Sequence, residues 1–184
     1  MATTTDARPP GSAEGLGAQA ELLARGLAAL RIFFGVILFA NGVSKLTNWQ
    51  DIHIGPYKSF LIDRPLTRKI LEDQGASTDV PLIGRIANDL ILPNWGLFQW
   101  VITFFELGVG ALLIVGLASR GAAAAGLGMQ VFLALLYFTA NRWTFEQPHE
   151  YVPLAILALA PAGRVWGIDG RLVASRPNLR RWPF

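Results

Sequence analysis

Apolar residues in this chain gather into four long runs, separated by polar segments of unequal length. The runs cover residues 22–46, 95–117, 121–140 and 151–168. A helix needs about 20 predominantly apolar residues to cross the hydrocarbon core of a bilayer. Short connections between consecutive helices favour antiparallel neighbours. The pattern therefore predicts an all-α membrane protein, folded as an antiparallel bundle of four transmembrane helices.

The first connection of this bundle, residues 47–94, is too long to be a passive linker. Two stretches within it have the start signals and the apolar spacing of helices. The first starts at Asp63-Arg64-Pro65 and ends at Gly75, and the second starts near Thr78. We expect an extramembrane loop that is partly helical and covers the outer end of the bundle.

The chain otherwise divides into one membrane domain with a tail at each end. Residues 1–20 are rich in Ala, Thr, Gly and Pro and predict a flexible tail, residues 21–170 form the membrane domain, and residues 171–184 form a basic tail. Arginines beside a membrane helix favour the cytoplasmic side. Since Arg8, Arg25 and the C-terminal arginines would share one side, we expect both termini to be cytoplasmic.

Composition agrees with membrane insertion and removes several chemistries. Charged residues make up 16% of the chain and the mean hydropathy is +0.39, whereas soluble domains carry about 25% charged residues. There is no cysteine, which excludes thiolate nucleophiles, disulfide exchange and cysteine-bound metal centres. The net charge of +3 comes largely from the C-terminal arginines. No nucleic-acid-binding motif is present.

Glu106 lies near the middle of the second apolar run, which otherwise carries no charge. A carboxylate at that depth is costly, so it marks a functional site by default. Three interpretations remain open. Glu106 pairs with a basic residue on a neighbouring helix, takes part in proton, electron or ligand chemistry, or donates to a backbone carbonyl in its protonated form.

Arg31 and Lys45, both in the first apolar run, are the basic candidates near Glu106. At a rise of about 1.5 Å per residue, we place Arg31 some 8 Å closer to the cytoplasmic face than Glu106. A long arginine side chain could span that gap or extend toward the interface. Arg31 and Glu106 are therefore our candidate catalytic pair, and Lys45 is either an interfacial anchor or a ligand contact.

Glu146 and His149 have the Glu-x-x-His spacing of di-iron bundles. Such sites need a second copy of the motif and further carboxylates, and Pro148 interrupts the local helix. We therefore predict no metal. With Glu150 these residues form a proton-accepting cluster, or a network of helix caps, at the outer mouth of the bundle.

A quinone site would need an apolar cleft with one or two polar groups for the carbonyl oxygens. Phe34 and Phe105 could form its walls, with Lys45 as a further contact and Glu106 as the protonatable group. Aromatic residues on membrane helices also serve simply as lipid or packing contacts, so this remains one of two interpretations.

Four segments together resemble the DoxX/DoxD family of small four-helix membrane proteins, and the DoxD type in particular. They are LRIFFG at residues 30–35, FANGVSKL at residues 39–46, FELGVGALLIVG at residues 105–116 and PAGRVWGID at residues 161–169. The resemblance implies a bundle associated with membrane redox complexes, since DoxD-type proteins form one subunit of thiosulfate:quinone oxidoreductase. It also marks four positions of the recurring family pattern: Arg31, Lys45, Glu106 and Asp169.

We therefore expect an integral subunit of the plasma (inner) membrane that associates with an oxidoreductase or respiratory assembly. Its partners would be lipids and other subunits, its possible cofactor a quinone, and whether it is itself an enzyme stays open. The alternative is a non-catalytic scaffold within a membrane complex. A small-solute carrier is disfavoured, because the sequence has neither inverted repeats nor paired broken helices.

Overall fold

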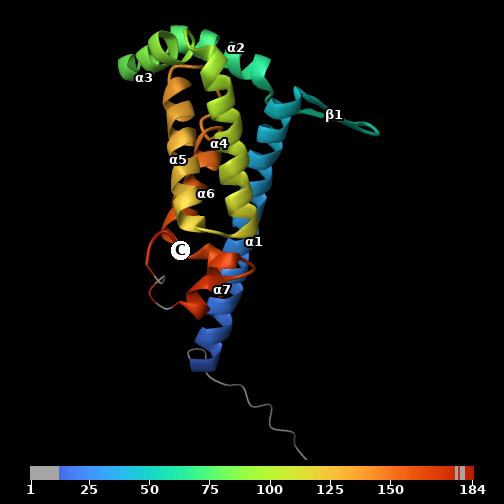
Figure 1. Cartoon of the computed structure of the whole chain (residues 1–184), viewed down its shortest axis with the longest axis vertical. Coiled ribbons are helices and arrows are strands. Elements are labelled where there is room, and N and C mark those ends of the chain that lie inside the picture. Colours follow the sequence, from blue (N-terminus) through green and yellow to red (C-terminus); the bar gives the residue numbers. More distant parts are fainter. Residues whose placement is uncertain (1–12, 177, 179–180) are drawn as a thin grey trace, which may run out of the picture.

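The computed structural model describes residues 13–176, 178 and 181–184. It contains an upright helical bundle with a cap of short elements at one end and a small helix at the other (Figure 1). We call these the cap end and the tail end. The predicted tail lies outside the described residues over positions 1–12, as does Arg180 in the basic tail.

Over residues 13–176, four helices pack around one apolar core. They are α1 (Ala13–Thr47), α4 (Trp95–Val115), α5 (Ser119–Leu136) and α6 (Pro148–Leu159). Each helix contributes buried apolar residues to this core: Phe34, Leu38, Val109, Leu113, Ala122, Ala123, Leu154 and Leu157. The all-α class predicted from the sequence is confirmed.

Among the described residues, α1, α4 and α5 are long and apolar enough to cross a membrane. Within the fourth predicted span, residues 151–168, Pro161 is expected to kink or end the helix. Helix α6 ends before it, so it has only 12 residues and measures about 18 Å. Proline explains both of its ends. Pro148 occupies the first helical position, and Ala160 is extended before Pro161. The chain continues through a short 3₁₀ turn into α7 (Ile168–Ser175).

The start of α1 also differs from the prediction. Helix α1 begins at Ala13, so residues 13–20 belong to the helix rather than to a flexible tail. The first described turns of α1 and helix α7 both lie at the tail end (Figure 1). The chain therefore returns to the end at which α1 starts, although α6 is short.

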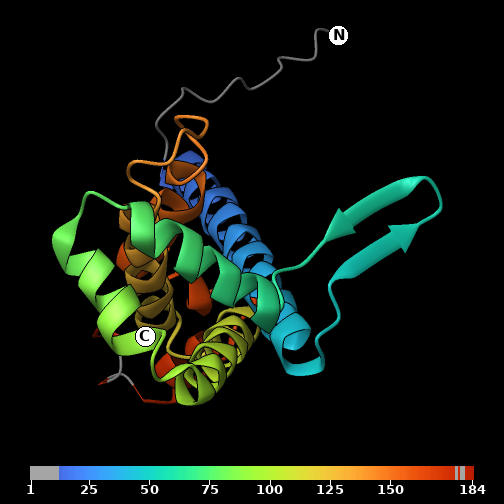
Figure 2. The ribbon, with the colours of Figure 1, turned by 90° about the horizontal axis from the view of Figure 1, so that it is seen from above.

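The cap consists of a β-hairpin and a group of short helices (Figure 2). Strands β1 (Asp51–Ile54) and β2 (Tyr57–Phe60) form the hairpin. Helices α2 (Arg64–Ser77) and α3 (Pro81–Arg85) follow, and the π-helix η1 (Ile86–Ile91) completes the cap. The loop is partly helical, as predicted, but the sequence analysis did not foresee the hairpin.

Asp63 starts α2, as its sequence context predicts, because its Oδ1 atom accepts the Leu66 N–H at 2.9 Å. The helix continues two residues beyond the predicted end at Gly75. Gly75 is instead a packing position, and its carbonyl accepts a 2.8 Å hydrogen bond from the Asn88 side chain. A second apolar core joins the cap to the end of α5 through Leu71, Ile83, Ala87, Ile91 and Leu136.

Glycines set the register between α1 and α4. A Cβ atom added to Gly110 would lie 2.5 Å from the Phe39 backbone nitrogen, and one added to Gly42 would lie 2.8 Å from that of Leu107. Small residues allow such close approach of membrane helices. Gly110 of α4 therefore faces α1.

The register predicts a sharp difference between two neighbouring glycines. Gly110→Ala should destabilise the protein by about 1–3 kcal/mol, the usual effect of overpacking. A Cβ atom at Gly108 would meet nothing within 4 Å, so Gly108→Ala is the matched control. Alanine has a higher helix propensity than glycine. Gly110→Ala can therefore destabilise the protein only if the added methyl group collides with α1. Thermal unfolding in detergent measures both variants, and equal midpoints would rule out the close approach.

Candidate functional site

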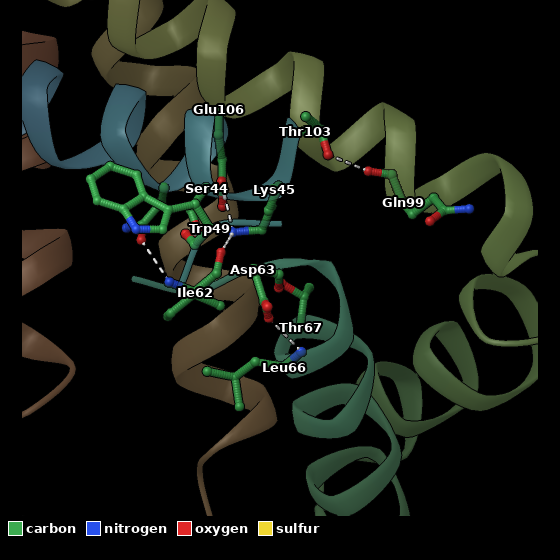
Figure 3. Close-up of polar contacts among 11 residues, drawn as sticks. Ser44, Lys45, Trp49, Ile62, Asp63, Leu66, Thr67, Gln99, Thr103 and Glu106 are labelled. Atoms are coloured by element: carbon green, nitrogen blue, oxygen red, sulfur yellow. Dashed lines mark hydrogen bonds and ion pairs between the residues drawn. The ribbon is translucent and has the colours of Figure 1, made fainter. Parts of the chain in front are cut away.

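A buried ion pair joins α1 to α4 near the cap end of α1. Lys45 Nζ lies 2.8 Å from Glu106 Oε2, and the two side chains are only 2% and 9% exposed. Lys45 Nζ also donates a 2.8 Å hydrogen bond to the Ile62 carbonyl (Figure 3). This confirms that Glu106 pairs with a basic residue on a neighbouring helix, although not with the residue we predicted.

The predicted Arg31–Glu106 pair is wrong, and the helix register explains why. Gly42 lies against Leu107 where α1 packs on α4, and this places Glu106 at the level of the end of α1. Arg31 lies 11 residues before Gly42, about 16 Å away along the helix axis. It therefore reaches the opposite end of α4, beside Gly116.

Lys45 is not an interfacial anchor, because its side chain is buried and held by the start of the cap. Asn41, one turn earlier on α1, accepts the Ile62 N–H at 3.1 Å through its side-chain oxygen. This bond fixes the Ile62 backbone, whose carbonyl in turn accepts from Lys45. Asp63 follows directly as the N-cap of α2, so the ion pair and the cap share one short segment of backbone (Figure 3).

A cavity of about 560 Å³ lies between this ion pair, the bundle and the cap. Its walls are mainly apolar and come from α2, η1, α4 and α5: Ile70, Leu71, Ile86, Ile91, Val101, Ile102, Phe105, Met129, Phe132 and Leu133. Ligand sites in proteins typically combine such walls with a few polar groups. Three lining residues are exposed: Val101 on α4, Gly128 on α5 and Arg142 after α5. The cavity therefore reaches the surface of the bundle on the side of α4 and α5.

A second polar group lines the cavity from the connection between α5 and α6. Arg142 forms an ion pair with Glu146, and its guanidinium carbon lies 4.1 Å from the centre of the Tyr137 ring. Burial raises the pKa of the Glu150 carboxyl, an effect that His149 opposes and Glu146 reinforces. Glu150 can therefore hold a proton at a higher pH than an ordinary carboxyl group.

Glu146 and His149, paired by spacing in the sequence, have different partners in the structure. Glu146 contacts Arg142, whereas His149 Nδ1 lies 3.0 Å from the Phe145 carbonyl. Within the described part of the chain, no three His, Asp or Glu side chains are placed to hold a metal ion. The cluster contributes charge at the side of the cavity.

The structure divides the predicted site residues into two groups. Lys45, Phe105 and Glu106 line the cavity. Phe34 belongs to the bundle core, and Arg31 lies at the other end of the bundle. The sequence analysis placed the first loop over the outer end of the bundle, but it did not assign residues of this loop to the wall of a site. The cavity is lined from the cap by Ile70, Leu71, Ile86 and Ile91.

Arg31 holds the tail end of the bundle together. It is fully buried and donates to two backbone carbonyls that follow α6, at 3.2 Å to Ala162 and 3.0 Å to Trp166. A Cβ atom on Gly116 or Gly167 would collide with its guanidinium group. Arg31 therefore holds the glycine-rich segment after α6 against α1, and it does not line the cavity.

Asp169 completes this tail-end cluster by capping α5 from a distant part of the chain. One carboxylate oxygen accepts the Ala118 N–H at 2.7 Å. The other accepts from Ser119 twice, at 2.9 Å from the backbone N–H and 2.7 Å from the hydroxyl. Charge-assisted bonds of this kind are about twice as strong as neutral ones. Of the four positions marked by the resemblance, Arg31 and Asp169 therefore serve the fold, and Lys45 and Glu106 face the cavity.

The ion pair should show strong coupling in a double-mutant cycle. Removing one member of a buried pair typically costs about 3–5 kcal/mol, because the other charge is left stranded. Lys45→Met and Glu106→Gln should each lower the unfolding free energy, and the double variant should lose much less than the sum. The control cycle combines Glu106→Gln with Arg31→Met and should be additive. Additive losses in the first cycle would exclude the pair.

The Asp169 cap predicts a second stability effect. Asp169→Asn places an amide N–H₂ group among three donors, so the variant should lose about 1–3 kcal/mol. Asp79 is exposed, so Asp79→Asn is a control for the loss of one negative charge. Equal unfolding midpoints in the two variants would show that the cap contributes no stability.

Comparison with known proteins gave one match. The sequence profile of the DoxX family matches residues 26–142, which include α1 from its second third onward, the cap, α4 and α5. The searches of curated proteins and of solved structures gave no match. Because the match covers more than half of the chain, and α1, α4 and α5 are long and apolar enough to cross a bilayer, the protein is a multi-pass membrane protein that belongs to the DoxX family.

Proposed function

We propose that the cavity beside Lys45 and Glu106 is a quinone-binding site, and that the protein is a membrane subunit of an oxidoreductase or respiratory assembly. The observation that carries this proposal is the combination of an apolar cavity and a buried ion pair at its wall. The resemblance to DoxD-type subunits of thiosulfate:quinone oxidoreductase points to the same chemistry.

The lining residues would offer a quinone both apolar and polar contacts. Phe105, Phe132 and Met129 offer apolar and aromatic contacts to a ring and its tail. The surface of α4 and α5 that the cavity reaches faces the region that lipid would occupy, so a lipophilic molecule could reach the cavity from the bilayer. A quinone would supply two-electron, two-proton redox chemistry at this place.

The ion pair has capacity for one further acceptor. An ammonium group carries three N–H donors, and Lys45 directs two contacts to the Ile62 carbonyl and Glu106. A ligand carbonyl oxygen could bind the third. Glu106 would then balance the lysine charge and exchange protons at the cavity wall, and Glu150, with its raised pKa, would exchange protons at the side of the α5–α6 connection.

The second candidate function is a non-catalytic scaffold that holds partner subunits. The extended cap and its hairpin favour this function, because they offer a large surface outside the bundle (Figure 2). In that case the cavity would be occupied by lipid, and the ion pair would serve only the fold.

We further propose that α6 and the segment after it complete a fourth membrane passage in the plasma membrane, with both termini cytoplasmic. The common tail-end position of early α1 and α7 supports an even number of passages (Figure 1). The exposed arginines of the tail end, among them Arg171 and Arg176, would lie against anionic lipid phosphates.

Quinone binding can be tested by filling the cavity. Gly128 lines the cavity and has open space at its Cβ position, so Gly128→Leu should extend into it without disturbing the backbone. We expect this variant, and Lys45→Met, to lose most of the quinone that co-purifies with the wild-type protein in mild detergent. Extraction followed by mass spectrometry measures the quinone-to-protein ratio.

Gly108→Leu is the matched control, because Gly108 also has open space but lies outside the cavity. It should retain the wild-type ratio. A wild-type protein that carries no quinone and does not bind an added short-chain ubiquinone would overturn the proposal. A stable complex with partner subunits under the same conditions would then favour the scaffold function.

The topology can be tested by cysteine labelling without background, since the chain has no cysteine. Ser175 in α7 and Ser77 in α2 are both exposed. Cysteine at Ser77 should react with a membrane-impermeant thiol reagent in intact cells, and cysteine at Ser175 should react only after permeabilisation. The opposite pattern would invert the topology, and equal reaction of both positions would contradict the fourth passage.

A further inference from the structure

The β-hairpin of the cap projects sideways from the bundle, next to the end of α1 (Figures 1 and 2). Its base is fixed to α1 by hydrogen bonds, which include the one from Lys45 to the Ile62 carbonyl. Ser44 donates to the Trp49 carbonyl at 2.7 Å, and Asn41 accepts the Ile62 N–H. The direction of the hairpin is therefore set by α1, which is a membrane-spanning helix.

Cross-strand pairing sorts the hairpin side chains onto two faces. Paired residues of an antiparallel ladder share a face, and successive pairs alternate. The pairs Ile52–Ser59 and Ile54–Tyr57 share one face, whereas His53–Lys58 and Asp51–Phe60 share the other. Toward the tip the first face is thus apolar and the second is polar and basic, with Phe60 as the exception at the base.

The apolar face is strongly exposed in the isolated chain. Ile54 and Tyr57 are 69% and 60% exposed. A single two-stranded hairpin is marginally stable in water, and needs an apolar surface to pack against. Something outside the bundle must therefore cover this face if the hairpin is to remain folded.

We propose that the hairpin is an interfacial membrane arm, whose apolar face lies against the lipid of the same bilayer that α1 crosses. Exposed apolar side chains lead from α1 toward the hairpin: Phe39 and Leu46, which are seven residues apart and so share one face of α1, and then Trp49. Trp and Tyr prefer the headgroup level of a bilayer. Lys58 and His53, on the opposite face, can then meet anionic headgroups and water.

This arrangement gives the arm a physical role. A hairpin that lies in the interface resists tilting of α1 and fixes the depth of the adjacent Lys45–Glu106 pair relative to the headgroups. The inference depends on membrane insertion alone, so it stands or falls independently of quinone binding.

The arm can be tested with spin labels on single cysteines, because the chain has none of its own. The variants Ile54→Cys and Tyr57→Cys report the apolar face, and His53→Cys and Lys58→Cys are matched controls on the polar face. The labelled proteins are reconstituted in vesicles of phosphatidylethanolamine and phosphatidylglycerol. Collision with oxygen, which concentrates in lipid, is compared with collision with a water-soluble nickel chelate.

We expect the oxygen-to-nickel ratio to be several-fold higher at positions 54 and 57 than at positions 53 and 58. Four labels with the same high nickel accessibility would show that the hairpin stands in water, and would overturn the proposal. Shielding of all four from both reagents would place the hairpin between copies of the chain and overturn it too. Shielding of positions 54 and 57 only in native membranes would assign the face to a protein partner instead.

Discussion

The structure depends on the requirement that every charge buried in an apolar bundle be compensated by a fixed partner. Lys45 and Glu106 meet this requirement with each other, and Lys45 also uses the Ile62 carbonyl. Arg31 uses backbone carbonyls after α6, and Asp169 uses donors at the start of α5. Unpaired, such groups would cost several kcal/mol each. The loops that connect the helices therefore pack against both ends of the bundle, because these loops supply partners for the buried charges.

The close contact of α1 and α4 at their glycine residues determines which charged side chains can form a pair. Since Gly42 faces Leu107, Lys45 comes level with Glu106, whereas Arg31 comes level with the turn after α4. A shift of one helical turn, about 5.4 Å, would separate Lys45 from Glu106 and leave both buried charges without a close partner. Packing and electrostatics thus require the same register, and each makes the other more specific.

Much of the fold could be predicted from the sequence, because it follows from local rules. The lengths of the apolar runs correctly predicted helices α1, α4 and α5, and Asp63 correctly predicted the start of α2. The partner of Glu106 could not be predicted, because an axial level estimated from one helix alone ignores how the facing helix is shifted. The apolar run of the fourth span continues past Pro161, and the helix ends before this proline because its ring cannot continue a helix. The hairpin escaped detection because its strands have only four residues each.

The candidate site likewise divides into a local part and a non-local part. A carboxylate within a membrane-spanning run is rare because its burial in lipid costs free energy. Glu106 could therefore be identified as a candidate site residue from the sequence alone. The cavity could not, because the helical spacing within the loop before α4 does not show how closely its residues approach Glu106. The segment from Ile62 to Asp63 joins these two parts, since one residue accepts from Lys45 and the next caps α2. A ligand oxygen that accepts from the third donor of Lys45 would therefore bind beside the Ile62 carbonyl, one residue before the N-cap of α2. The cavity, the ion pair and the start of the cap helices thus meet at one short segment of backbone.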